Sequence, residues 1–68
     1  MTLVEAMQLL YKHEINFKIY SCWDGGVCVC LLNGMMEDDH ATEAYFAIED
    51  IDKAGDYLIK QAKLGDGE

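Results

Sequence analysis

Three cysteines and two histidines are the side chains in this sequence that could bind a metal ion or take part in redox chemistry. Cys22, Cys28 and Cys30 lie close together, but none of them forms a Cys-x-x-Cys pair, the spacing that gathers thiolates around zinc. His13 ends a predicted helix, and His40 follows two aspartates in a predicted loop. We therefore expect no metal ion and no cofactor. The thiols are interpreted as small apolar side chains, and a redox role for them stays open.

Side chains for covalent or acid-base catalysis are few. Ser21 is the only serine in the chain, and no recognisable base accompanies it. The sequence also has no glycine-rich loop of the kind that binds phosphate groups. We therefore predict that the protein is not an enzyme.

The composition is that of one small folded domain, residues 1–68, with a formal net charge of -8. Hydrophobic residues make up 51% of the chain, which is enough for a core. Five lysines oppose thirteen acids, so the chain would repel the phosphates of nucleic acids and of anionic membranes. Three cysteines leave no complete disulfide framework, and the first residues lack a targeting pattern. We expect a cytoplasmic protein without a membrane span.

Two helices are predicted near the ends of the chain. The first begins at Thr2, because Thr2 and Glu5 have the spacing of a capping box. The second begins at Asp50, an expected N-cap, and Gly55 inside it predicts close packing of this helix on the sheet. Apolar residues recur at helical spacing at Leu3, Ala6, Met7 and Leu10, and again at Ile51, Ala54, Leu58, Ile59 and Ala62.

Two runs of alternating apolar residues lie between the helices and predict a β-hairpin. We predict a three-residue loop, residues 24–26, which pairs Trp23 with Val27. Cys22 and Cys28 would then lie directly opposite each other. A two-residue loop would instead send the valines of the second strand to the other face of the sheet.

Residues 41–48 are compatible with two structures. Ala44, Phe46 and Ile48 alternate as in a strand and would face the core. The apolar residues from Ala41 onward also fit a heptad, so a single long helix is the alternative. We favour the strand. The predicted fold class is then α+β, in the order helix, three-stranded antiparallel sheet, helix (αβββα), with both helices on one sheet face.

The sequence resembles two groups of proteins in its local patterns. The Trp-Asp-Gly-Gly hairpin at residues 23–26 and the run at residues 48–58 resemble segments of short uncharacterised phage and bacterial proteins. The element order resembles the double-stranded-RNA-binding domain. That family binds phosphates with lysines at the start of its second helix, where this chain has Asp50, Ile51, Asp52 and Lys53. The resemblance therefore implies the fold without the RNA-binding activity.

Most of the negative charge lies in the second half of the chain. Residues 1–34 contain three acids and two lysines, whereas residues 35–68 contain ten acids and three lysines. A concentrated negative field of this kind attracts a basic surface on another protein. A solvated surface that serves only solubility is the alternative. The candidate partner-binding acids are Glu37, Asp38, Asp39, Glu43, Asp50, Asp52 and Asp56.

The sheet face turned away from the helices is predicted to be unusually apolar. It carries Tyr20, the three cysteines and Leu32, with Lys18 as its lysine and Tyr45 alongside. Such a face is typical of a contact surface for a partner or for a second copy of the chain, and a covering loop or terminus is the alternative. Tyr20, Tyr45 and Trp23 are the candidate aromatic anchors.

In size, acidity and compactness the chain resembles anti-CRISPR and other anti-defence proteins, which are small and encoded by phages or mobile elements. These proteins commonly occupy a basic nucleic-acid channel. The resemblance implies an inhibitor of a nucleic-acid-handling host defence complex that binds a basic groove in place of nucleic acid, in the host cytoplasm. The alternative is a homodimeric structural or regulatory protein that pairs through the outer sheet face and has no inhibitory role. Neither hypothesis includes direct binding of nucleic acid or of a membrane.

Overall fold

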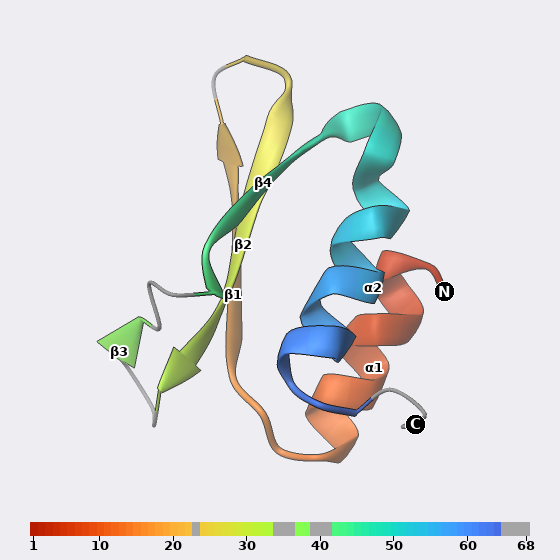
Figure 1. The fold of residues 1–68 in the computed structure, drawn as a ribbon, viewed down its shortest axis with the longest axis vertical. Helices are drawn as coiled ribbons and strands as arrows, with labels where there is room; N and C mark the ends of the chain where they lie inside the picture. The colour runs from red at the N-terminus through yellow and green to blue at the C-terminus, as the bar shows by residue number, and fades with distance from the viewer. Residues whose placement is uncertain (23, 34–36, 39–41, 65–68) are drawn as a thin grey trace.

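Two helices lie on one face of an antiparallel sheet in the computed structural model of the protein, which describes residues 1–22, 24–33, 37–38 and 42–64 (Figure 1). The predicted order of helix, three-stranded antiparallel sheet and helix is confirmed. Trp23 and Asp39, two of the predicted partner-binding residues, lie outside the described residues. No helix in the described part of the chain has both the length and the apolar character needed to cross a membrane.

Helix α1 (Leu3–Lys12) begins as the capping box predicts. The Glu5 backbone N–H donates to the Thr2 hydroxyl oxygen at 3.1 Å, and the Thr2 backbone N–H donates to the Glu5 carboxylate at 2.8 Å. Together these bonds satisfy two backbone donors that a helix start would otherwise leave to solvent. One side of α1 is buried through Ala6 and Leu10. At the other end, Glu14 has a φ of 58°, which turns the chain back toward the sheet.

The hairpin of β1 (Phe17–Cys22) and β2 (Gly26–Asn33) corrects the predicted register. Cys22 pairs with Gly26, so the turn lies between these two residues, one residue earlier than predicted, and the pairing is shifted by two residues. Gly25 has a φ of 88°, a conformation that glycine adopts at low cost. A shift of two residues keeps every side chain on its predicted face. Cys22 and Cys28 are therefore diagonal neighbours rather than direct partners.

The third predicted strand is β4 (Ala44–Ala47), which pairs with β2 and makes β2 the central strand. The alternative of one long helix is therefore wrong. The paired positions of Ala44 and Phe46 are Val29 and Val27, so both lie on the face of the core. Ile48 was expected beside them but is 57% exposed, because a short 3-10 helix, η2 (Ile48–Asp50), ends the strand there.

A further short strand, β3 (Glu37–Asp38), pairs with the last residues of β2. Its partners are Leu32 for Asp38 and Asn33 for Glu37. This pairing lies at the C-terminal end of β2, beyond the residues of β2 that pair with β4.

Helix α2 (Ile51–Gln61) corrects two local predictions. Asp50 stands at the N-cap but makes no capping hydrogen bond, and its carboxylate lies 3.7 Å from the ammonium of Lys53. Gly55 packs against helix α1 rather than against the sheet, since a Cβ there would lie 2.9 Å from the Leu3 Cα. The two helices run side by side in the same direction (Figure 1).

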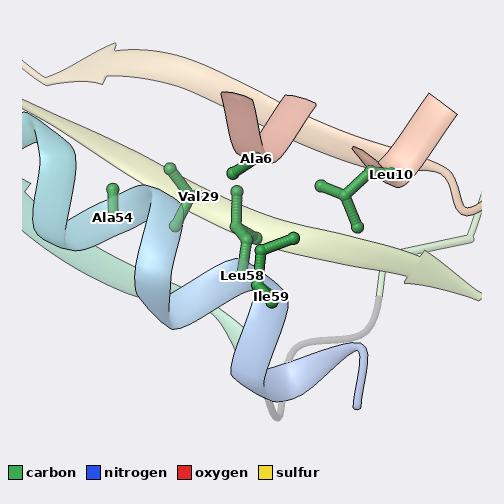
Figure 2. Packing of buried hydrophobic residues seen from close by; sticks show 6 residues of the cluster. All are labelled: Ala6, Leu10, Val29, Ala54, Leu58 and Ile59. Carbon is green, nitrogen blue, oxygen red and sulfur yellow. The ribbon is translucent and has the colours of Figure 1, made fainter. Parts of the chain in front are cut away.

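The core lies between the helices and the central strand (Figure 2). Leu10 and Leu58, one from each helix, are fully buried together with Val29 of β2. Burying one leucine side chain contributes about 1.5–3 kcal/mol of hydrophobic free energy. The buried cluster consists of Ala6, Leu10, Val29, Ala54, Leu58 and Ile59.

Candidate functional site

Two tyrosines lie on the outer face of the sheet, the face turned away from both helices. Tyr20 of β1 pairs with Cys28 of β2, and Cys28 pairs with Tyr45 of β4, so the three side chains form one row across three strands. Tyr20 is 39% exposed and Tyr45 is 46% exposed. Exposed aromatic side chains grouped on one face of a sheet are typical of contact surfaces.

Gly26 makes room for the Tyr45 ring. A Cβ at position 26 would lie 2.5 Å from two carbon atoms of that ring and 2.5 Å from the carbonyl oxygen of Phe46. The ring therefore lies directly over the Gly26 backbone, beside the start of β2. This contact explains why the first position of β2 requires a glycine.

Each tyrosine hydroxyl lies beside a carboxylate. The Tyr20 hydroxyl donates to the Glu43 carboxylate, and this hydrogen bond, with a smaller contribution from Cys28, raises the pKa of Tyr20 above its usual 10.0. Partial burial raises the pKa of Tyr45, and the Asp24 carboxylate next to its hydroxyl raises it further. Both tyrosines therefore stay protonated at neutral pH, and each presents a neutral hydroxyl group next to a carboxylate.

Thr42 holds the segment that carries Glu43. It is only 7% exposed, and its hydroxyl accepts a hydrogen bond from the Leu31 backbone N–H at 2.9 Å. Its carbonyl oxygen accepts from the Tyr57 hydroxyl at 2.7 Å, and the Tyr57 ring packs against Phe46 at a centroid distance of 5.5 Å. The two bonds tie the chain to β2 on one side and to α2 on the other. Sequence reasoning missed Thr42, because its partners are distant in the chain and leave no local pattern.

Two thiols lie beside the tyrosines: Cys28 stands between them in the row, and Cys22 follows Tyr20 by two residues in β1. The sulfur atoms of Cys22 and Cys28 are 2.8 Å apart. This contact is the main cause that raises the pKa of Cys22 to about 11, followed by partial burial and by the negative charges nearby. Cys22 is therefore protonated at neutral pH. Among the described residues, no group of three or more histidine, cysteine or acidic side chains is placed to hold a metal ion.

Cys30 is the third cysteine of the outer face and differs from the other two in burial. It is 1% exposed and pairs with Lys18 of β1. The Lys18 ammonium lies 5.1 Å from the centroid of the Tyr20 ring, which is the geometry of a cation-π contact. Cys30 is therefore buried, and the exposed part of the outer face is centred on Tyr20 and Tyr45.

The exposed part of the outer face is acidic. Asp24, Glu43 and Glu49 are exposed, and the negative charges of Asp24 and Glu49 both act on the Tyr45 hydroxyl. Lys18 is the lysine of this face. We name these residues the tyrosine face: Tyr20, Tyr45, Asp24, Glu43 and Glu49.

Three of the predicted partner-binding acids lie elsewhere, in or next to α2. The Leu3 backbone N–H donates to the Asp52 carboxylate at 3.2 Å, and the Asp56 carboxylate lies 3.2 Å from the N-terminal ammonium group. These two carboxylates lie at the start of α1, where the helix dipole is positive. Asp50, Asp52 and Asp56 therefore lie with the two helices and are not part of the tyrosine face. Glu37 and Asp38 form β3.

Asp24 and Glu49 were not among the predicted binding residues, although both belong to the tyrosine face. Asp24 was interpreted only as a turn residue, and the place of Glu49 depends on η2, which no residue pattern indicated. Comparison of the chain with protein-family models, with curated proteins and with solved structures found no match.

Proposed function

We propose that the protein is a small acidic interaction module that binds a partner protein through the tyrosine face. The observation that supports this proposal is the row of Tyr20, Cys28 and Tyr45, in which each exposed ring lies beside a carboxylate. Rings supply contact area at a low cost in side-chain entropy, and carboxylates around them supply direction and charge. The two features together are more typical of a partner-binding surface than of a surface that serves only solubility.

The partner in this proposal presents a basic surface. The Glu43 carboxylate lies at the Tyr20 hydroxyl, the charges of Asp24 and Glu49 act on Tyr45, and the whole chain has a net charge of -8. Arginine and lysine side chains of a partner bind carboxylates and also stack on tyrosine rings. A surface rich in both suits a groove lined with these basic residues.

Basic grooves of this kind normally hold nucleic acid. We propose that the protein is a phage-encoded inhibitor that occupies such a groove in a host defence complex, as its resemblance to anti-CRISPR proteins in size and acidity implies. The carboxylates then take the positions of phosphates, and association weakens as salt concentration rises. A homodimer through the tyrosine face is the competing proposal. It is disfavoured because two copies would bring like charges together.

The test compares matched variants in binding to the partner. Tagged protein captures the partner from lysate of cells that carry the gene, and the purified partner is then titrated with each variant. Glu49→Lys reverses a charge on the tyrosine face, whereas Glu14→Lys makes the same change at an exposed site beyond α1. Tyr45→Ala removes a ring of the face, whereas Tyr11→Ala removes a ring that is 72% exposed on α1.

We expect Glu49→Lys to weaken binding about tenfold and Tyr45→Ala about thirtyfold, with both controls within about twofold of the wild type. We also expect nucleic acid to displace the protein from its partner. Equal losses in the control variants would reject the tyrosine face. Binding that nucleic acid does not displace would reject the groove. A mass in solution twice that of one chain would favour the homodimer.

A further inference from the structure

The thiols of Cys22 and Cys28 have the geometry of a dithiol that can close to a disulfide. Cys22 ends β1 and Cys28 lies in β2, diagonally across the strand pair, with their sulfur atoms 2.8 Å apart. The sulfur atoms of a disulfide are ~2.0 Å apart, so the bond requires an approach of less than about 1 Å. The residue paired with Cys22 is Gly26, which has no side chain to stand between the two sulfur atoms.

We propose that Cys22 and Cys28 form a redox-active pair that glutathione disulfide, or another small disulfide oxidant, converts to an intramolecular disulfide. In the first step, one thiolate attacks the oxidant, forms a mixed disulfide and releases one glutathione thiolate. In the second step, the other protein thiolate attacks the sulfur atom of the first cysteine and releases a second glutathione. The two protein thiols lose two protons and two electrons, and one glutathione disulfide becomes two glutathione molecules.

Cys30 is the natural internal control for this pair. It lies on the same sheet face but is 1% exposed, so an oxidant in solution has poor access to it in the folded protein. Cys22 and Cys28 are both partly exposed. In the folded protein, the geometry therefore favours the disulfide between Cys22 and Cys28. In the unfolded chain, any two of the three cysteines can form a disulfide.

The disulfide would change the centre of the tyrosine face. It would close the loop from Cys22 to Cys28 into a ring and remove the thiol of Cys28 that acts on the Tyr20 hydroxyl. The pair is inferred from geometry alone and does not depend on the proposed partner. Its test accordingly measures the bond and not binding.

The experiment uses the full chain, reduced and then equilibrated in glutathione buffers of increasing oxidant ratio. Acid quenching, alkylation and peptide mass mapping then identify the linked cysteines. We expect the Cys22–Cys28 linkage to dominate in the native protein. We also expect its equilibrium constant against glutathione to exceed that of the same pair in denaturant by at least about tenfold, which is ~30 mV. The folded Cys30→Ser variant should form the same bond.

Two variants and one comparison keep the proposal falsifiable. Cys22→Ser and Cys28→Ala should each abolish the intramolecular bond, and circular dichroism would show whether both remain folded. Lasting mixed disulfides with glutathione, disulfide-linked dimers, or a distribution of linkages equal to that in denaturant would each overturn the assignment. So would a Cys22–Cys28 bond that forms only in denaturant.

Discussion

Gly55 of α2 packs against Leu3 of α1 so closely that the two helix backbones touch. A Cβ at position 55 would lie 2.9 Å from the Leu3 Cα, 2.9 Å from the Thr2 carbonyl oxygen and 3.2 Å from the Ala6 Cβ. Two of these neighbours are backbone atoms, which cannot rotate away as the end of a long side chain can. The glycine therefore sets the distance between the helices.

Gly55→Ala should lower the free energy of unfolding by about 1–2 kcal/mol. The added Cβ pushes the two helices apart, and this loss of packing exceeds the ~1 kcal/mol that the higher helix propensity of alanine contributes. Urea unfolding would measure the change. Lys60→Ala, at an exposed position of the same helix, should stay within about 0.5 kcal/mol of the wild type. A Gly55→Ala protein more stable than the wild type would contradict the close packing of the helices.

Thr42→Val should destabilise the fold by about 1–3 kcal/mol, because it leaves the Leu31 backbone N–H without its acceptor at a buried position. Thr42→Ser keeps the hydroxyl and should recover most of this loss. Thermal unfolding of both variants checks the prediction. If the valine and serine variants were equally stable, the hydroxyl would have no role in holding the segment before β4.

The capping box predicts an acid dependence of stability. The pKa of Glu5 lies below its usual 4.5. The main cause is the hydrogen bond with the Thr2 backbone, and the hydrogen bond with the Thr2 side chain contributes less. Because the folded state favours the charged form, the contribution of Glu5 to stability is present above pH 4.5 and is lost as pH falls through the lower pKa of the folded state. Urea unfolding at pH 6 and at lower pH should show a loss in the wild type that is smaller in Glu5→Gln. Equal losses would exclude this contribution.

The hydrogen bond between Tyr20 and Glu43 predicts an alkaline dependence. The pKa of Tyr20 is raised above 10.0, so the folded state favours the protonated phenol, and this contribution is present below pH 10 and lost as pH rises further. Glu43→Gln removes the charge and should bring the pKa of Tyr20 down toward 10. NMR of ring-labelled tyrosine would follow the titration residue by residue. Glu14→Gln is the control, and an unchanged Tyr20 titration in Glu43→Gln would contradict the contact.

Local signals in the sequence were sufficient for the first helix and for the faces of the hairpin. The capping box at Thr2 and Glu5 depends on residues three positions apart, so the sequence alone predicts it. The apolar alternation predicts which residues of β1 and β2 share a face, since parity survives a shift of two residues. Both features are determined within one element or one hairpin.

The exact register could not be predicted, because two adjacent glycines can be divided between loop and strand in more than one way. Gly25 occupies the turn position with positive φ, whereas Gly26 lies in β2, where the Tyr45 ring on its backbone leaves no room for a Cβ. That contact comes from a strand about twenty residues later. The role of Gly55 was missed for the same reason, since the atoms that require a glycine belong to α1.

The candidate site was only partly visible in the sequence. Tyr20 and Tyr45 could be predicted on one face, because alternation in each strand determines their side. The carboxylates beside them could not all be predicted, since Asp24 and Glu49 reach Tyr45 from a turn and from η2. Charge counted along the chain pointed instead to Asp52 and Asp56, which the fold places at the start of α1.

The cluster of Leu10, Val29 and Leu58 joins the first helix to the last one, which has a consequence for synthesis on the ribosome. The hairpin of β1 and β2 pairs residues that are near in the sequence and can form early. The apolar side of α1 lacks its neighbours from α2 until that helix has been synthesised. Folding of the nascent chain is therefore completed late, and a chain interrupted before residue 51 leaves that side open to chaperones or to aggregation.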